Sequence, residues 1–290
     1  MYPENEIHLS EKGIKFRVED QFFQLDDIDV IWKRRFNGNF SQYIINKKDF
    51  IQDSPEIIKY LKREVKTIED YILNFARDLN IKIINDYDER IVDKLYQMKM
   101  ANHFQLNTPK FLVSNKVNAV QQFCSGTNTI TKPISNYGYF FEKNRIFTTG
   151  TNTFRPEHLD DSTETIFPSF VQEQIISAGE LKCLLVGDKI FASLQAPNEG
   201  LISSDIKRDY RKGAIHLSGY DIPDELKSKL LRLLKYYKLD VCTFDLIMTD
   251  KKEFRFIEIN SDGIMLFYAQ FIDGLDLVEE ISNYIIEHKN

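Results

Sequence analysis

Apolar and polar residues alternate along this chain with two different periods. Before residue 50 the period is two, which is typical of half-buried strands, in the runs EIHLS (6–10), IKFRV (14–18), QFFQL (21–25) and DVIWKRRF (29–36). From Ser54 to Leu79 apolar residues recur at helical spacing, and Ser54-Pro55 is a helix start signal. The next segment is expected to be a β-α-β unit, with strand 81–86, helix 88–104 and strand 110–114.

The rest of the chain combines a strand-rich middle with a mixed last third. Residues 110–195 consist mostly of strand-like runs, with one helix near 116–124, and predict an antiparallel sheet. The last third contains a basic loop at 205–213, a helix at 223–237, a hairpin at 241–260 and a closing helix at 275–289.

Composition then excludes several classes of function. A net charge of −6 argues against general nucleic-acid binding, which needs a basic surface. No apolar run reaches the roughly 18 residues of a membrane helix, and the start MYPENEIHLSEKG lacks signal-peptide features, so we expect a cytoplasmic protein. The histidines and cysteines show no zinc-ligand spacing, and Cys124, Cys183 and Cys242 are expected to be buried reduced thiols.

The hairpin at 241–260 places polar residues inside an apolar run. Side chains of a strand alternate between its faces, so Glu258 and Asn260 are expected on the same face as Phe254 and Phe256. The opposite face of that strand would then carry Arg255, Ile257 and Ile259.

The length of the hairpin loop predicts which residues oppose one another. If residues 250–253 form a four-residue loop, Asp245 faces Glu258 and Thr243 lies beside Asn260. Two carboxylates this close repel each other unless a cation lies between them. Two carboxylates and an amide suit Mg²⁺, so Asp245, Glu258 and Asn260 are candidate metal ligands. The alternative is an exposed hairpin face whose charges point to water.

An Asp on one strand and Glu-x-Asn on its partner resemble the metal hairpin of the ATP-grasp ligases. The resemblance covers roughly residues 85–290. It implies an α+β fold of three lobes, with the nucleotide between two α+β lobes that contain antiparallel sheets, and a smaller N-terminal α/β lobe. The expected boundaries are 1–100 for the N-terminal pre-ATP-grasp lobe, 101–180 for the central nucleotide-binding lobe and 181–290 for the C-terminal lobe with the metal hairpin.

The same resemblance assigns residues to ATP. Lys94 and Lys132 match the family's two nucleotide-facing lysines. A lysine that closes an apolar strand is costly to bury unless an anion meets it, and the alternative for Lys132 is a snorkelling surface side chain. The further contacts implied are backbone groups around Glu173, Gln174 and Ile175 with adenine, Glu180 with ribose hydroxyls, and Lys182 with phosphate or acyl phosphate.

Within that superfamily the chain is most similar to the graspetide synthetases, the microviridin-type and grasp-with-spasm peptide maturases. WKRRF (32–36) resembles their Trp-x-Arg-Arg signature, so Arg34 and Arg35 would bind substrate carboxylates through planar bidentate contacts. The loop DIKRDY resembles their Asp-x-basic pair. The residues implied are Asp205 for substrate recognition and Lys207, Arg208 and Arg211 for catalysis. A solvated basic segment is the alternative at both places.

The reaction implied by the resemblance is ATP-dependent ligation within a peptide. A peptide Asp or Glu carboxylate attacks the γ-phosphoryl group to form an acyl phosphate, and a Ser or Thr hydroxyl or a Lys amine then displaces phosphate. ATP and Mg²⁺ would be the cofactors, a precursor peptide with a leader and an acidic core would be the partner, and a homodimer is possible, with no nucleic acid or membrane involved. The alternatives are another carboxylate-amine ligase of the superfamily and an inactive nucleotide- or peptide-binding homologue.

Overall fold

The computed structural model describes residues 6–34, 55–88, 93–135, 139–142, 145–159, 163–197, 215–261, 263 and 265–289. The chain divides into two compact units, each of which is described by itself. The first unit takes in residues 1–86, 238–241 and 276–290, and the second takes in residues 87–237 and 242–275. In the described residues no helix is both long and apolar enough to cross a membrane.

The first unit begins with an antiparallel sheet of order β1-β2-β3, followed by a short 3-10 helix. A strand–helix–strand segment comes next, in which the two strands pair in parallel. The helix at the carboxyl end of the chain also belongs to this unit. The elements are β1 (Glu6–Ser10), β2 (Gly13–Val18), β3 (Gln21–Gln24), η1 (Leu25–Asp27), β4 (Val30–Trp32), α2 (Pro55–Asp78), β5 (Lys82–Ile84) and α8 (Leu277–Glu287).

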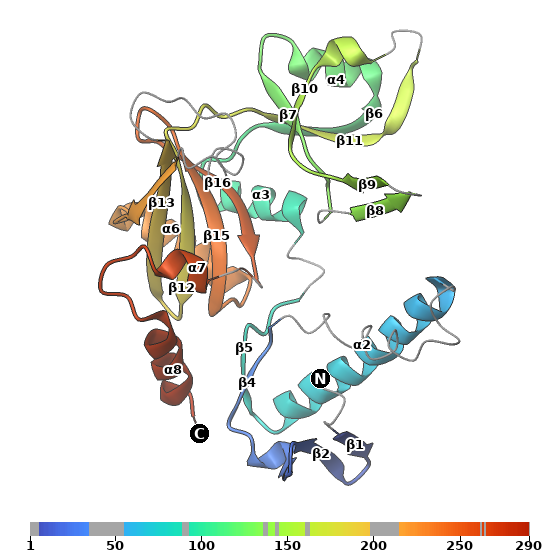
Figure 1. The fold of residues 1–290 in the computed structure, drawn as a ribbon, viewed down its shortest axis with the longest axis vertical. Coiled ribbons are helices and arrows are strands. Elements are labelled where there is room, and N and C mark those ends of the chain that lie inside the picture. The colour runs from blue at the N-terminus through green and yellow to red at the C-terminus, as the bar shows by residue number, and fades with distance from the viewer. Residues whose placement is uncertain are drawn as a thin grey trace. The chain divides into compact units, whose positions relative to one another are not determined.

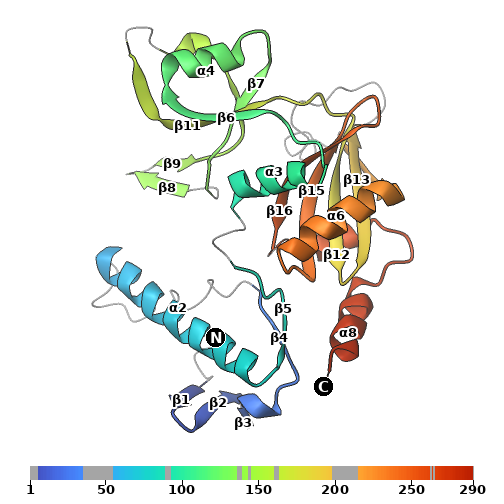
Figure 2. The ribbon, with the colours of Figure 1, turned by 180° about the vertical axis from the view of Figure 1, so that it is seen from behind.

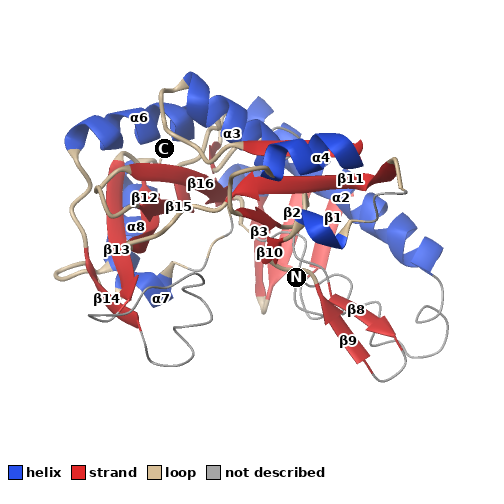
Figure 3. Cartoon of the chain, turned by 90° about the horizontal axis from the view of Figure 1, so that it is seen from above, coloured by secondary structure: helices blue, strands red, loops and turns tan. Residues whose placement is uncertain are grey.

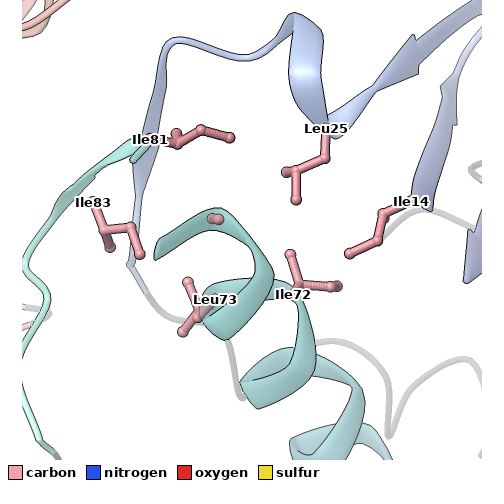
Figure 4. Packing of buried hydrophobic residues seen from close by; sticks show 7 residues of the cluster. Ile14, Leu25, Ile72, Leu73, Ile81 and Ile83 are labelled. Carbon is pink, nitrogen blue, oxygen red and sulfur yellow. The ribbon is translucent and has the colours of Figure 1, made fainter. Parts of the chain in front are cut away.

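Helix α2 supplies one side of the apolar core of the first unit. Ile72, Leu73 and Ala76 of this helix are buried against strand and loop residues, and Figure 4 shows the side chains pointing into one cluster. The helix ends in a Schellman motif, because Asn80 adopts a left-handed φ of 59° and the amide of Ile81 donates to the carbonyl of Ala76. The cluster's other buried members are Ile14, Leu25, Ile81 and Ile83.

Parallel pairing occurs in a different place from the one the sequence predicted. The expected β-α-β unit ran from the strand at 81–86 through a helix to the strand at 110–114. In the structure β5 pairs with β4 across α2, whereas the later strand joins another sheet. The hydrophobic pattern identified the elements, although the helix begins at Lys94 and not at residue 88 as expected. The pattern carries no information on strand partners.

The second unit contains a central sheet of order β10-β7-β11-β6, in which the pairs are antiparallel as predicted. The strands Gly179–Val186 and Lys189–Pro197, which the sequence placed in the same sheet, belong instead to the larger sheet of this unit. Helix α4 packs on β6 and β11, where Val120 and Cys124 meet Val171 (Figure 3). A separate hairpin, β8-β9, lies between β7 and β10 in sequence. The elements are α3 (Lys94–His103), β6 (Phe111–Lys116), α4 (Val117–Cys124), β7 (Thr129–Thr131), β8 (Tyr139–Glu142), β9 (Arg145–Thr148), β10 (Asn152–Phe154), η2 (Pro156–His158) and β11 (Thr165–Glu173).

The larger sheet of the second unit has the order β14-β13-β12-β15-β16. Helices α6 and α7 lie on opposite faces of it, as Figures 1 and 2 show from the two sides. Leu230, Leu233 and Leu234 of α6 are buried, as are Phe244 and Phe256 of the sheet. The elements are β12 (Gly179–Val186), β13 (Lys189–Pro197), β14 (Ile215–Gly219), α6 (Asp224–Tyr236), β15 (Val241–Met248), β16 (Phe254–Asn260) and α7 (Leu266–Ala269).

Candidate functional site

One face of the larger sheet collects polar side chains from neighbouring strands. Residues that oppose each other across a ladder share a face, and the register pairs Glu180 with Gln195, Lys182 with Ser193, Asp245 with Glu258 and Thr243 with Asn260. Lys182 of β12 also contacts Asp245 of β15, which joins the two hairpins on the same side. We call these eight residues the polar face.

The predicted opposition of Asp245 and Glu258 is confirmed, but the loop length and the register next to the loop differ from the expected ones. The hairpin turns through three residues, 250–252, because the amide of Lys252 donates to the carbonyl of Thr249 at 2.9 Å and Lys252 has a left-handed φ of 58°. Met248 therefore faces Phe254, one residue out of the predicted register. A bulge at Ile257 inserts one extra residue and restores the predicted pairs beyond it.

This bulge also corrects the predicted faces. Phe256 opposes Leu246 and Glu258 opposes Asp245, so the phenylalanine and the glutamate lie on opposite sides of the sheet. Phe256 and Ile259 are buried in the core, 1 % and 5 % exposed, on the α6 side. Glu258 and Asn260 thus reach the polar face without sharing it with an aromatic side chain.

Each of the two hairpin carboxylates of the polar face is paired with a lysine. The ammonium of Lys182 contacts Asp245, and the Nζ of Lys94, on α3, lies 3.4 Å from an oxygen of Glu258. The four side chains are only 11–19 % exposed, so they interact in a medium where charges are weakly screened. The two carboxylates that the sequence predicted would repel each other are therefore compensated by the protein's own cations.

The surroundings of Lys182 stabilise its charged form. Burial acts most strongly and would lower the pKa of this ammonium, but the attraction of Asp245, the hydrogen bond to it and the charge of Glu180 together raise the pKa above its usual value. The ring of Tyr268, on α7, lies 5.9 Å from the ammonium. Tyr268 was not predicted as a site residue, and its contact depends on how α7 folds back over the sheet.

Gln97 holds the strand that carries Glu258 and Asn260. This buried side chain lies one helical turn after Lys94 on α3, and its Oε1 accepts from the amide of Ile259 at 2.7 Å while its Nε2 donates to the carbonyl of Ile259 at 3.2 Å. One side-chain amide thus satisfies both backbone groups between the two candidate ligands. Sequence analysis missed Gln97, although its i, i+3 spacing from Lys94 was a usable signal.

The donor set of the hairpin fits a magnesium ion. Oδ1 of Asp245 is buried and has no hydrogen-bond partner among the described residues, while Oδ2 accepts from Lys182. Within the described ranges, no three His, Cys, Asp or Glu side chains gather as a metal site. Two carboxylates with an amide oxygen match Mg²⁺, which binds few protein groups and keeps several waters. We conclude that Asp245, Glu258 and Asn260 fit this ion.

A glycine is required where the chain leaves the hairpin. The amide of Gly263 donates to the carbonyl of Asn260 at 3.2 Å, and a Cβ added at Gly263 would lie 1.7 Å from Oγ1 of Thr243. Any side chain at this position would therefore displace the neighbour of Asn260.

Lys132 and the residues predicted to bind adenine lie on the central sheet or just after it. Lys132 directly follows β7, and its ammonium lies 5.5 Å from the ring of Phe170. The amide of Glu173 donates to Lys110 and that of Gln174 donates to Asn128, each at 2.9 Å. The amides of Glu173 and Gln174 therefore have protein partners, and the loop that follows β11 begins with Gln174 and Ile175.

The predicted substrate contacts lie in the first unit or outside the described residues. Arg34 belongs to the first unit, where its guanidinium lies 5.3 Å from the ring of Trp32. The other predicted contacts lie outside the described residues and stay predictions; they are Arg35, Asp205, Lys207, Arg208 and Arg211.

A family profile and several solved structures match this chain. The profile described as RimK-like ATP-grasp domain matches residues 91–285. The macrocyclase MdnC of Microcystis aeruginosa MRC, solved with precursor peptide MdnA, is 23 % identical with a TM-score of 0.79, over 99 % of this chain and 88 % of that one. A RiPP-associated ATP-grasp ligase of Chryseobacterium gregarium, solved with ADP and a leader and core peptide, is 19 % identical with a TM-score of 0.79, over 100 % and 88 %.

A third structure extends the comparison. The ATP-grasp ligase PsnB, complexed with a phosphomimetic variant of a minimal precursor, Mg and ADP, is 17 % identical with a TM-score of 0.75, over 99 % of this chain and 88 % of that one. No curated protein sequence matches the chain. The fold is the ATP-grasp fold, as predicted. The chain belongs to the RimK-like ATP-grasp family, and its profile match covers both the central and the larger sheet.

Proposed function

We propose that this chain is an ATP-dependent ligase that links side chains within a ribosomal precursor peptide. The observation that carries the proposal is the pair Asp245 and Glu258, which share one face and are each paired with a lysine. In the described part of the chain, one buried oxygen of Asp245 has no hydrogen-bond partner. Such an arrangement suits a metal-bound nucleotide. The choice of a peptide substrate is supported by the structural neighbours, which include a macrocyclase solved with its precursor peptide.

Asp245, Glu258 and Asn260 would hold Mg²⁺, which supplies charge neutralisation to the phosphates when it is bound. Lys94 and Lys132 would contact the phosphates and Glu180 the ribose. The adenine edge would meet the backbone around Glu173, Gln174 and Ile175. Because the amides of the first two already donate to protein carbonyls, we expect the amide of Ile175 to be the donor in this group.

The protein's own part in the reaction is positioning and charge compensation. A carboxylate oxygen of the peptide attacks the γ-phosphorus of ATP, the bond from that phosphorus to the bridging oxygen breaks, and ADP leaves. A Ser or Thr hydroxyl or a Lys amine then attacks the acyl carbon, loses its proton and releases phosphate. Lys182 lies on the polar face where it can stabilise the negative charge of the acyl phosphate.

The remaining parts of the proposal rest on family resemblance. Arg34 and Arg35 would bind substrate carboxylates together with Asp205, and Lys207, Arg208 and Arg211 would assist the transfer. We further propose the lobe boundaries 1–100, 101–180 and 181–290, a cytoplasmic location and a homodimer. Recognition of a leader segment of the precursor would provide specificity.

The test is mass spectrometry of a small acidic precursor peptide encoded beside this chain, incubated with the protein, ATP and Mg²⁺. We expect the peptide to lose one water for each linkage formed. Glu258→Gln should abolish the product while the fold is kept, because it removes a charged metal ligand. Glu253→Gln is the matched control, since this exposed carboxylate pairs with Arg255 at the loop end of the hairpin and is not one of the eight residues of the polar face.

Two results would contradict the proposal. Full activity of Glu258→Gln would exclude the metal site. An unchanged peptide mass with ATP turnover on free amino acids would identify the chain as a different carboxylate-amine ligase of its family.

A further inference from the structure

Two polar side chains of the polar face have no role in the function proposed so far. Ser193 and Gln195 lie on β13, opposite Lys182 and Glu180. Ser193 is fully buried and Gln195 is 5 % exposed. Within the described part of the chain, Oγ of Ser193 and Nε2 of Gln195 have no hydrogen-bond partner. Sequence analysis did not identify either residue.

Buried polar groups without partners are uncommon because each costs about 1–3 kcal/mol. Here the two atoms lie on the same face as Oδ1 of Asp245, another buried atom without a partner. Nε2 of Gln195 donates no hydrogen bond to Glu180, although Glu180 faces Gln195 across the ladder. Unsatisfied groups that gather on one sheet face, beside the proposed reaction centre, indicate a ligand group that is received there.

The chemistry of the two side chains restricts that ligand. A glutamine Nε2 only donates hydrogen bonds, and a serine hydroxyl can donate one. The neighbouring Lys182 is a cation. Two donors beside a cation are suited to an oxygen acceptor that carries negative charge.

We propose that Ser193 and Gln195 form a subsite for the acidic side chain of the substrate, donating hydrogen bonds to the carboxylate that becomes the acyl phosphate. This inference rests on the proposed function and names two residues that select its substrate. A phosphate oxygen of ATP has the same acceptor chemistry, so the experiment must separate the two sources. The subsite lies on the Lys182 side of the polar face, across from the metal hairpin.

The experiment measures carboxylate activation without requiring ring closure. The probe is N-acetyl-glutamate N-methylamide, or its aspartate homologue, with ATP, Mg²⁺ and hydroxylamine. The probe's carboxylate displaces ADP from the γ-phosphorus, and the hydroxylamine nitrogen then attacks the acyl carbon to give a hydroxamate and phosphate. Hydroxamate formation is followed separately against the concentration of the probe and of ATP.

We expect Ser193→Ala and Gln195→Met each to raise the KM for the probe by about tenfold, the effect of losing one hydrogen bond to a charged group. The KM for ATP should stay within twofold. Gln195→Glu should raise the KM for the probe further, because it places a carboxylate against a carboxylate. Melting temperatures of the apolar variants should not fall, since each removes an unsatisfied buried group.

Ser218→Ala is the matched control, because Ser218 of β14 opposes Leu194 and so lies on the other face of the same sheet. An unchanged KM for the probe, or a lowered melting temperature with both KM values intact, would overturn the subsite. A raised KM for ATP alone would assign the donors to phosphate and also overturn it. If the wild-type protein forms no hydroxamate from the probe, the subsite is overturned, whereas the proposed function fails only if the precursor peptide also stays unchanged.

Discussion

At the scale of single residues, the amide of Gln97 fixes the position of the proposed metal ligands. β16 lies at the edge of its sheet in the described part of the chain, so its outward backbone groups need partners from elsewhere. Gln97 supplies both of them at Ile259, between Glu258 and Asn260. On the same helix, Lys94 pairs with Glu258. Helix α3 thus supplies hydrogen-bond partners to the backbone of this strand at Ile259 and a cation that pairs with Glu258.

We expect Gln97→Leu to increase the Mg²⁺ concentration needed for half-maximal ATP turnover by about tenfold, because the two ligands are no longer held in place. Turnover should recover at saturating Mg²⁺, which a general loss of folding would not allow. Hydrogen exchange at the Ile259 amide should become faster. Gln122→Leu, at an exposed glutamine of α4, is the control. An unchanged Mg²⁺ requirement would show that Gln97 contributes to packing but does not position the metal ligands.

Gln97→Glu tests the two hydrogen bonds of this residue separately. The new carboxylate can still accept from the amide of Ile259 but cannot donate to its carbonyl. It also brings a negative charge close to Glu258. An activity between those of the wild-type protein and the leucine variant would show that both bonds contribute.

At the scale of secondary-structure elements, sequence analysis found the hairpin but not its bulge. Residue spacing predicted the helices over 54–79 and 223–237, and α2 and α6 begin and end within one residue of those limits. The opposition of Asp245 and Glu258 was predicted correctly although the loop is one residue shorter than assumed. A bulge depends on local backbone geometry that period-two patterns do not record. The short helix α7 was missed because four residues are too few to show a helical period. Strand β14 was also missed.

Deletion of Ile257 tests what the bulge does. The shortened strand can keep Glu258 opposite Asp245 and Asn260 opposite Thr243, because the deleted residue is the unpaired one. The bend of the strand would be lost, and bulges commonly re-aim a neighbouring side chain. We expect a folded protein whose Mg²⁺-dependent ATP turnover is reduced at least about tenfold.

Ile257→Val separates the number of residues from the identity of the side chain, and it should behave like the wild-type protein. Circular dichroism and thermal melting establish that both variants are folded. Wild-type turnover in the deletion variant would show that the bulge has no part in aiming Glu258.

At the scale of the whole molecule, the first unit is assembled from segments that are distant in the sequence. Asn85 joins two of them: its Oδ1 accepts from the amides of Asp240 and Val241, each at 2.9 Å, and its Nδ2 donates to the carbonyl of Val241 at 2.7 Å. Asp240 in turn accepts from Lys82 and from the hydroxyl of Tyr284 on α8. Sequence patterns could not reveal this network, because its hydrogen bonds join residues as many as 158 positions apart.

Asn85 also has a left-handed φ of 63°, a conformation that asparagine tolerates better than most residues. Asn85→Ala should therefore destabilise the first unit by about 3 kcal/mol, because three buried backbone groups lose their partners and the new residue is strained. Asn85→Gly relieves the strain but does not restore the lost hydrogen bonds. The stability of this variant should therefore lie between those of the alanine variant and the wild-type protein.

Hydrogen exchange measured by mass spectrometry checks this prediction and shows which segments lose stability. Protection should fall in β5, around Asp240 and in α8, while peptides from the central sheet keep their wild-type rates. Asn85→Asp should resemble alanine despite its similar shape, since it loses the donor to Val241 and sets a second carboxylate beside Asp240. Equal protection in all four proteins would mean that the three segments are held together by apolar packing alone. The cluster of Ile72, Leu73 and Ile83 would then be the next set of residues to truncate.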